Sequence, residues 1–580
     1  MIRFRTRATI VAALLTAACL YPTGPAAAQK VSVDRRLPPD VYAYVTIPSV
    51  PELKKRLKGS TYGEIYRDKA FAEFIKDVEV QIKKGSAEIE KQIGLKLDDL
   101  LEIPSGEIAI AVGKSDRPVP AIAVFLDFGK NEETVDKILT LATKDLKKKQ
   151  GFDRRIITHK GTKITSYFRK GADDEEDKDA AKKMDQAYFI KDTFFVFGTD
   201  VAFLKQVVDR WDGRPAKSFA TTPAYKYIKA RTKTSRPPVV TWYVDPLGLV
   251  NAAILNNPEL GAGAGLAMGF LKPLGVTNFK AVGGSMDLDV GGYDSLSKTV
   301  MYVDLPATGA LDLFKFPAVV QQPPKWVPAD ASNYMALNWS LPAAYKAVAT
   351  IYGTISFGGP EALGKQIDEW SKDPAGPGIH VKKDLLDQLD GRMHVFSDFT
   401  DPDDATTVRA LFALGTKDAA KIEAVLKKLA ALPTFPGRSR KFKEHTIYEV
   451  DGGNFGALGT TVAIGVARKH LMLTNNAKLL EQIIAGNAKK PLADDKVYQQ
   501  ITAKLPKKTS MLTFQRSNMQ LKAIYDKLRS GEFGENPDVD FKKLPPFAAL
   551  KKYLRPSGGY AAPDKHGVYL ESFSLRKKKK

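Results

Sequence analysis

Short apolar runs dominate the chain, and many of them come in adjacent pairs. Residues 107–112 and 121–127 form one pair, and residues 187–190 and 193–198 form another. Two residues separate the members of the second pair, and so short a connection joins strands that run antiparallel. This pattern predicts β-hairpins rather than the single strands of a parallel sheet.

Helical periodicity occupies stretches between these pairs. Residues 131–146 begin at Asn131, a residue type favoured at helix N-caps, and place Val135, Ile138 and Leu139 at three- to four-residue spacing. Helices therefore interrupt pairs of strands instead of alternating with single strands. We predict an α+β fold in which helices pack on a largely antiparallel sheet.

The same order of elements occurs twice in the chain. In each occurrence a glycine precedes a strand-like run, a second strand and a helix follow, and a further strand and helix come later. Residues at matching places are Asp40 and Asp330, Gly106 and Gly391, and Val201 and Ala477. An extra charged segment, 172–183, leaves both of its flanks in register, as a surface loop does. The sequence thus predicts two tandem copies of one domain.

This repeat divides the chain into five segments. A chain of 580 residues is too long for one ordinary core, and 44% hydrophobic residues are enough for two cores. Paired prolines and glutamines before residue 327 favour extended backbone between the copies. The predicted segments are a signal peptide at 1–28, a first domain at 37–316, a Pro/Gln-rich linker at 317–326, a second domain at 327–575 and a basic tail at 576–580.

The amino terminus has the pattern of an export signal. Three arginines precede an apolar run over residues 8–20 that is too short to span a bilayer, and small residues lead to a cleavage position between Ala28 and Gln29. Cleavage there removes Cys19, the one cysteine of the chain. In the alternative interpretation Cys19 is a lipid anchor, because residues 16–19 loosely match a lipobox. The short arginine-bearing start and the alanine-rich cleavage site are typical of bacterial signal peptides.

A mature chain without cysteine excludes disulfides, thiolate metal sites and cysteine nucleophiles. No apolar stretch after residue 28 approaches the roughly 18 residues that a transmembrane helix needs. We therefore expect a periplasmic or secreted protein without a transmembrane helix in its mature chain. In the alternative interpretation the protein is lipid-anchored in the cell envelope.

No motif stands out for catalysis, cofactor binding or metal binding, and we assign no residue to any of these roles. Residues 359–366 have the glycine and lysine spacing of a phosphate-binding loop, but Gln366 replaces the Ser or Thr that would bind Mg²⁺. The six histidines, among them His394 and His470, lack metal-site or triad spacing and are interpreted as surface or strand-end residues. The acidic run 398–404 is interpreted as a solvated turn rather than a calcium site.

The net charge of +22 points to an anionic partner. Its densest part is the tail, whose residues are Arg576, Lys577, Lys578, Lys579 and Lys580. Such a tail can contact an anionic envelope polymer or an anionic lipid surface, or it can act only as a solubilising end. Another envelope protein is a further candidate partner. Aromatic residues that could stack on bases are absent from the tail, which argues against specific nucleic-acid binding.

Several segments together resemble a known kind of protein. They are the opening Leu37–Val45, the helix start Pro51–Leu53 and the segment 94–101, all within a tandem layout. This combination resembles an uncharacterised family of exported bacterial proteins with a domain of unknown function. The resemblance implies export and duplication over most of the mature chain, and it implies no activity.

Two classes of function remain. The first is a non-enzymatic envelope or secreted protein whose duplicated domains form a binding or assembly surface. The lack of a recognisable catalytic, cofactor or metal motif and the predicted repeat favour this class. The alternative is a hydrolase that acts on an envelope polymer through carboxylates that the sequence does not place. A cleft that holds paired carboxylates with shifted pKa values would favour the hydrolase.

Overall fold

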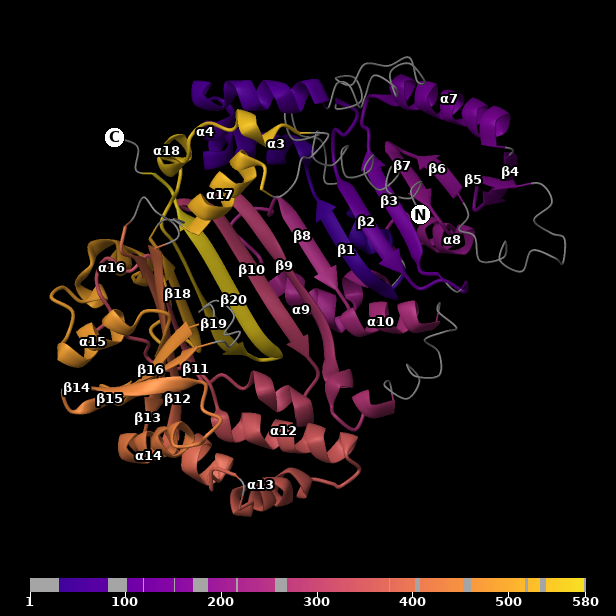
Figure 1. Ribbon diagram of the computed structural model, residues 1–580. Helices are drawn as coiled ribbons and strands as arrows, with labels where there is room; N and C mark the ends of the chain where they lie inside the picture. Colours follow the sequence, from indigo (N-terminus) through magenta and orange to yellow (C-terminus); the bar gives the residue numbers. More distant parts are fainter. Residues whose placement is uncertain are drawn as a thin grey trace. The chain divides into compact units, whose positions relative to one another are not determined.

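A computed structural model of the chain combines helices with a large antiparallel sheet (Figure 1). The structure describes residues 31–81, 102–117, 119–150, 152–169, 186–214, 217–255, 269–374, 376–401, 407–451, 461–516, 520–532 and 539–577. The mixture of helices and antiparallel strands that the sequence predicts is thereby confirmed.

Packing divides the chain into two units. Unit 1 comprises residues 1–265, 280–302 and 528–553, and unit 2 comprises residues 266–279, 303–527 and 554–580. The two predicted copies are stretches of repeated sequence, whereas the units are defined by packing. Each unit therefore includes a short segment from the other half of the chain.

The strands of unit 1 pair with one another in the order β10–β9–β8–β1–β2–β3–β7–β6–β5–β4. These strands are β1 (Val41–Ile47), β2 (Ile108–Gly113), β3 (Ala121–Asp127), β4 (Phe152–His159), β5 (Thr162–Arg169), β6 (Gln186–Lys191), β7 (Phe194–Gly198), β8 (Val240–Val244), β9 (Phe279–Val290) and β10 (Tyr293–Val303).

The helices that accompany these strands are mostly short. They are α2 (Val33–Arg36), α3 (Val50–Gly59), α4 (Thr61–Tyr66), η1 (Lys69–Phe71), α7 (Glu132–Gln150), α8 (Val201–Asp209), η3 (Phe219–Thr221), α9 (Pro223–Arg231) and α10 (Pro246–Leu255). Residues 72–81 are also helical. The later segment adds η11 (Phe541–Lys543) and α18 (Phe547–Lys551), and α17 (Gln520–Ser530) begins in unit 2 and ends in unit 1.

The strands of unit 2 pair in the order β20–β19–β18–β11–β12–β13–β17–β16–β15–β14. These strands are β11 (Asn333–Asn338), β12 (Leu389–Phe399), β13 (Val408–Thr416), β14 (Gly437–Phe442), β15 (His445–Asp451), β16 (Thr461–Ala467), β17 (His470–Thr474), β18 (Met511–Gln515), β19 (Ser557–Asp564) and β20 (Gly567–Leu575).

Five α-helices of the described residues accompany the sheet of unit 2. They are α12 (Leu341–Ile355), α13 (Ala362–Lys372), α14 (Ala419–Ala430), α15 (Ala477–Ala485) and α16 (Lys496–Thr502). Its short 3₁₀ and π helices are η4 (Val276–Asn278), η5 (Gly309–Phe314), η6 (Val381–Leu385), η7 (Leu386–Gln388) and η10 (Leu492–Asp494).

Local sequence explains the hairpin and helix that were predicted first. The strands predicted at 187–190 and 193–198 are β6 and β7, and Asp192 in their turn has a φ of 53°, a left-handed value that Asp tolerates better than most residues. The helix predicted at 131–146 is α7, which continues to Gln150. Its apolar face packs Val135 with Phe128 and Ile103 in one cluster of the core. Both predictions are confirmed apart from their ends.

The core of unit 1 contains a cluster of aromatic rings from β1, η3, α9 and β8. Tyr44 of β1 and Tyr243 of β8 pack with Phe219 and Tyr225, and the ring centroids lie 4.0 to 5.9 Å apart. Alternation along β1 places Tyr44 and Thr46 on one face of the sheet. The same face therefore carries both the aromatic core and polar side chains.

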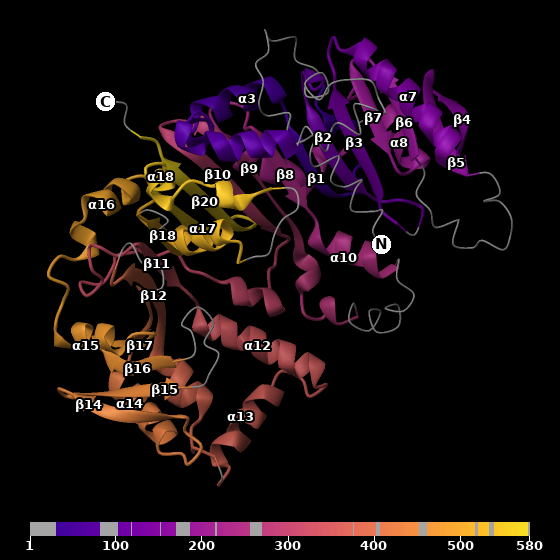
Figure 2. The same ribbon diagram turned by 45° about the horizontal axis from the view of Figure 1, so that its top comes forward.

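The segment 528–553 completes unit 1 beside helix α4. Tyr553 donates a hydrogen bond from its hydroxyl to Asp68 at 2.6 Å, and Lys543 forms an ion pair with Asp77. The rings of Phe541 and Phe74 stack with centroids 6.2 Å apart. Figure 2 shows α18 of this segment beside α3. Residues far apart in the sequence thus hold this corner of unit 1 together.

The segment predicted as a linker, 317–326, makes specific contacts within unit 2. Val319 and Thr509 exchange backbone hydrogen bonds of 2.9 and 3.0 Å, and the side chain of Gln321 donates to the carbonyl oxygens of Thr509 and Ser510. Trp326 at its end is 4% exposed. Residues 317–326 form no helix, and they pack against Thr509 and Ser510, which precede β18.

Across the described ranges, no helix combines the length and the apolar character that crossing a membrane requires.

Candidate functional site

A cavity of about 2440 Å³ lies within unit 1. Its described lining comes from the chain before β1, from α3 and α4, from residues 102–107, and from α9, β8 and β9. The sheet contributes Tyr44, Thr46 and Thr241 to this lining. The cavity therefore lies where the helices pack over the face of the sheet that carries polar side chains.

Glu107, one residue before β2, is fixed at the sheet side of this cavity. Its Oε1 accepts hydrogen bonds from Thr46 Oγ1 at 2.8 Å and from Tyr44 OH at 3.4 Å. Its Oε2 accepts a hydrogen bond from the backbone N–H of Val33 at 3.1 Å. Three donors from two segments thus hold one carboxylate in a single orientation.

Asp34 of α2 is a second carboxylate of the lining, and its side chain is 2% exposed. It accepts hydrogen bonds from Ser32 Oγ at 2.5 Å and from Tyr225 OH at 3.1 Å, and it forms an ion pair with Lys229 of α9. The ring of Tyr225 packs edge-on against that of Tyr44, with centroids 5.9 Å apart. A pair of tyrosines therefore connects the hydrogen bonds of Asp34 with those of Glu107.

The pKa values of the two carboxyl groups shift in opposite directions. Burial raises the pKa of Glu107 to about 7, the hydrogen bonds from Thr46 and Val33 oppose this shift, and the charge of Asp34 adds to it. Burial also disfavours the charged form of Asp34, but the charge and hydrogen bond of Lys229 outweigh burial and lower the pKa of Asp34. Such divergence occurs at acid–base sites and in structural networks alike.

Basic residues predominate on the wall of the cavity. Among the described residues that line it, eleven are Lys or Arg and five are Asp or Glu. Lys58, Lys226 and Lys233 are exposed, and their ammonium groups have no hydrogen-bond or ion-pair partner among the described residues. The lining thus carries positive charge that is available to an anion.

Two tyrosines of α4 also belong to the lining and are open to solvent. Tyr62 is 56% exposed and Tyr66 is 43% exposed. They lie four residues apart, so they share one face of the helix.

Unit 2 contains a cluster of rings that the sequence did not indicate. His394 lies within β12 and is 7% exposed, and its Nδ1 is 2.9 Å from the hydroxyl of Tyr334. The rings of Trp326 and His470 pack edge-on against it, with centroids 6.2 and 5.5 Å away. Burial lowers the pKa of His394 to about 3, and the charges of His470 and Arg392 add to this shift. The interpretation of His394 as a surface or strand-end residue is wrong, because β12 runs through the packed sheet.

Asp398 also differs from its interpretation as part of a solvated turn. It lies within β12 with a side chain that is 3% exposed, and Arg409 of β13 binds both of its oxygens at 2.7 and 2.8 Å. Residues 402–406 of the same acidic run lie outside the described residues. Of residues 359–366, which have the spacing of a phosphate loop, 359–361 belong to the connection from α12 to α13 and 362–366 form the start of α13.

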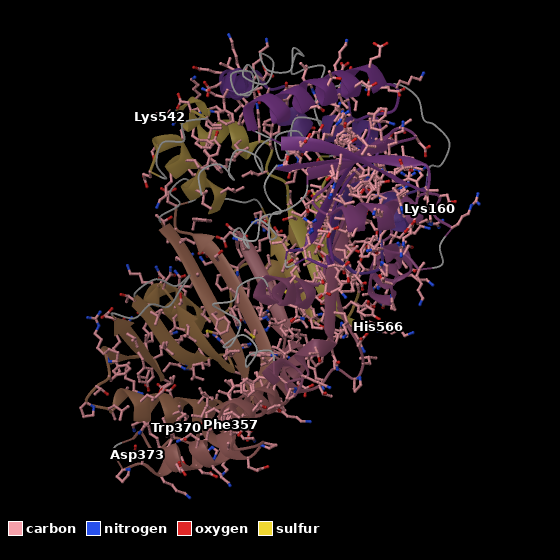
Figure 3. The ribbon with its side chains drawn as sticks, turned by 90° about the vertical axis from the view of Figure 1, so that its right-hand side faces the viewer. Lys160, Phe357, Trp370, Asp373, Lys542 and His566 are labelled. Atoms are coloured by element: carbon pink, nitrogen blue, oxygen red, sulfur yellow. The ribbon has the colours of Figure 1, made fainter. Side chains whose placement is uncertain are left out.

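Unit 2 also exposes large aromatic side chains. Phe357 is 83% exposed and Trp370 is 54% exposed. Figure 3 shows both on the part of unit 2 that contains α12 and α13. The ring of Phe270 packs edge-on against Phe357 with centroids 5.9 Å apart.

Of the residues that the sequence singled out, the two that the structure describes do not line the cavity. Arg576 and Lys577 are exposed after β20 in unit 2 and are not among its lining residues. Those outside the described residues are Cys19, Ala28, Gln29, Lys578, Lys579 and Lys580. Sequence reasoning missed Glu107, which it saw only as the first residue of a predicted strand. An acidic residue at the start of an apolar strand is the one signal that could have indicated it.

Comparison with family models gives one match. Residues 326–537 match the family described as "Protein of unknown function (DUF3352)". No curated protein and no solved structure matches the chain. The match supports the resemblance to an uncharacterised family for part of the second half of the chain, whereas bacterial origin, export and duplication stay predictions.

Proposed function

We propose that the protein is an exported, non-enzymatic binding protein of the cell envelope or the secreted fraction, and that the cavity of unit 1 receives an anionic polymer. The observation that carries this proposal is the excess of basic over acidic residues on the described lining. Charges act over a Debye length of about 8–10 Å at physiological salt, so a basic wall raises the local concentration of anions. Lys58, Lys226 and Lys233 supply charge that no described neighbour neutralises.

We further propose that two copies of one domain build the chain. When β1 to β10 are matched in order with β11 to β20, the pairing order of unit 2 repeats that of unit 1 at every position. The register supports the same correspondence. Tyr44 and Tyr334 come four residues after the matched residues Asp40 and Asp330, and they lie opposite Ala111 and Phe396, which come five residues after the matched Gly106 and Gly391. Ten strands can be ordered in many ways, so an equal order favours duplication over coincidence.

The binding proposal is tested on the purified chain that starts at residue 29. Titration calorimetry with polygalacturonate, polyphosphate and neutral dextran measures which polymers bind. A triple variant, Lys58→Glu, Lys226→Glu and Lys233→Glu, is expected to bind both anionic polymers at least tenfold more weakly. Dextran is expected not to bind either protein.

A matched control carries the same charge change in unit 2. Lys346, Lys365 and Lys372 are exposed on α12 and α13, and Lys→Glu at all three is expected to change binding less than twofold. A chain that ends at Leu575 tests the tail in the same way. Equal losses in the cavity variant and the unit 2 control would refute the cavity as the site, as would a failure of both anionic polymers to bind.

A hydrolase acting on an envelope polymer is the second candidate. The observation that favours it is the pair Glu107 and Asp34 in one cavity with opposite pKa shifts. Both carboxylates are already bonded to protein groups, whereas a general acid must reach its substrate. The geometry therefore favours a binding protein over a hydrolase. Release of reducing ends from polygalacturonate that disappears in Glu107→Gln would establish the hydrolase, and intact polymer would exclude this activity on it.

Export is tested separately by the intact mass of the mature protein. A chain that starts at Gln29 supports cleavage after Ala28. A chain that starts at Cys19 with the added mass of acyl groups would replace this proposal with a lipid anchor.

A further inference from the structure

Tyr62 and Tyr66 form an exposed aromatic surface within the lining of the unit 1 cavity. Their exposed fractions are 56% and 43%, although the transfer of a tyrosine ring out of water lowers the free energy. Residues four apart on a helix have Cβ atoms about 5–6 Å apart, a spacing comparable to the length of one sugar residue in a chain. Two rings at this spacing can pack against two successive rings of a ligand.

Helix α4 holds these tyrosines in place before any ligand arrives. Gly63 lies so close to α3 that an added Cβ would be 2.5 Å from the carbonyl oxygen of Leu57, so only glycine permits this packing. The backbone N–H of Thr61 donates to Asp294 at 2.8 Å, and the hydroxyl of Tyr66 donates to Glu79 at 2.8 Å. A surface that is already ordered loses less entropy when it binds.

The segment 528–553 fixes the end of the same helix. Asp68 follows α4 closely and accepts a hydrogen bond from Tyr553 at 2.6 Å, and Lys552 forms an ion pair with it at 2.5 Å. The position of the tyrosine surface therefore depends on residues near the end of the chain.

The other polar groups of the cavity show which ligand fits this surface. The lining combines basic side chains with the exposed carboxylate of Glu102 and with many Ser and Thr hydroxyls, among them Ser49 and Thr234. A carboxylate and the hydroxyls of Ser and Thr accept hydrogen bonds from hydroxyl groups, which sugar rings carry and a polyphosphate chain does not. A ligand that offers hydroxyl donors as well as negative charge satisfies both kinds of side chain.

We propose that the cavity binds an acidic glycan, a polymer of sugars with carboxylate groups, whose sugar rings pack on Tyr62 and Tyr66 while its carboxylates contact the lysines. This inference rests on the proposed function, because it specifies the anionic polymer that the cavity receives. Single-stranded DNA also combines negative charge with rings that can stack. Its phosphodiester backbone, however, offers no hydroxyl groups along the chain, whereas each sugar of an acidic glycan offers both hydroxyl groups and a carboxylate. The exposed carboxylate of Glu102 and the Ser and Thr hydroxyls of the lining therefore favour the glycan.

The test compares ligands that share charge but differ in sugar content. Titration calorimetry measures binding of an oligogalacturonate, a polyphosphate of equal charge and oligo-dT to the full mature chain. The double variant Tyr62→Ala and Tyr66→Ala is expected to bind the oligogalacturonate at least tenfold more weakly and polyphosphate less than twofold more weakly. The double variant with Phe at both positions keeps the rings and is expected to stay within threefold of the parent.

A control variant removes an exposed aromatic ring outside the cavity. Trp370 is labelled in Figure 3, and Trp370→Ala is expected to leave the affinities for all three ligands unchanged. Tyr62 and Tyr66 are exposed, so equal thermal unfolding temperatures confirm that the variants fold. Equal losses for polyphosphate and oligogalacturonate, or tighter binding of oligo-dT, would overturn the glycan but leave the anion site intact. If none of the three ligands binds, the proposed function itself fails.

Discussion

Corresponding places in the two units hold different chemistry. Before β1, the guanidinium of Arg36 lies 4.4 Å from the ring centroid of Phe194, whereas before β11 the ring of Trp326 packs edge-on against His470 at 5.4 Å. Under the proposed duplication, Arg36 corresponds to Trp326 and Phe194 to His470. One order of strands therefore accommodates either a buried cation or a cluster of neutral rings, and the fold alone does not determine the site.

The same contrast continues along the sheet. Arg56 of α3 forms an ion pair at 2.5 Å with Asp287 of β9, whose side chain is fully buried. The corresponding strand of unit 2 is β19. Gly283 of β9 lies opposite Tyr243 and Gly558 of β19 lies opposite Phe514, so the two glycines occupy matching places. Four residues after each glycine, unit 1 has Asp287 and unit 2 has Ala562. Unit 1 thus buries charged groups at places where unit 2 has apolar groups and neutral imidazoles.

The largest expected effect concerns the neutral imidazole of unit 2. The folded pKa of His394 is about 3, below the ordinary value of 6.5, so the contribution of this neutral imidazole to stability is complete above pH 6.5 and is lost as pH falls toward 3. A shift of this size corresponds to at most about 5 kcal/mol. His394→Asn is expected to reduce the acid sensitivity measured by urea unfolding at pH 7, 5 and 4.

The control for this prediction is His445→Asn. His445 lies on β15 and its Nδ1 is 2.8 Å from the carbonyl oxygen of Val466. If both variants change the acid dependence equally, the buried position of His394 is not its cause.

A somewhat smaller effect is expected from the buried ion pair of unit 1. Arg56→Met leaves the charge of Asp287 without its nearest partner, and breaking a buried pair in this way costs about 3–5 kcal/mol. The double variant Arg56→Met and Asp287→Leu makes this place apolar, as it is in unit 2, and is expected to recover most of the loss in thermal unfolding. A double variant as unstable as the single one would show that unit 1 requires charge at this place.

The smallest of the three effects concerns Glu107. Its folded pKa of about 7 lies above the ordinary value of 4.5, so its contribution to stability is complete below pH 4.5 and is lost as pH rises through 7. The difference corresponds to about 3 kcal/mol. Glu107→Gln is expected to flatten the pH dependence of unfolding between pH 4.5 and 7.5, in the direction opposite to His394→Asn. A variant with the parent's slope would contradict the burial of this carboxyl group.

Sequence patterns predicted the strand pairs, helix α7 and the mixed fold because neighbouring residues determine alternation, helical spacing and short turns. The candidate site lay beyond such patterns. Glu107 accepts hydrogen bonds from residues 61 to 74 positions away, and Asp34 binds Tyr225 and Lys229, 191 and 195 positions away. No local spacing reveals partners at these separations.

The sequence by itself predicted two strand pairs, helix α7 and the mixed α+β fold, and it determined the total charge of +22. Tertiary structure decided where that charge gathers, which carboxylates are buried and which tyrosines stay in water. It also decided that the segment 528–553 completes unit 1. The physical reason is that elements form from local backbone preferences, whereas desolvation and pairing depend on side chains that only the folded chain brings together.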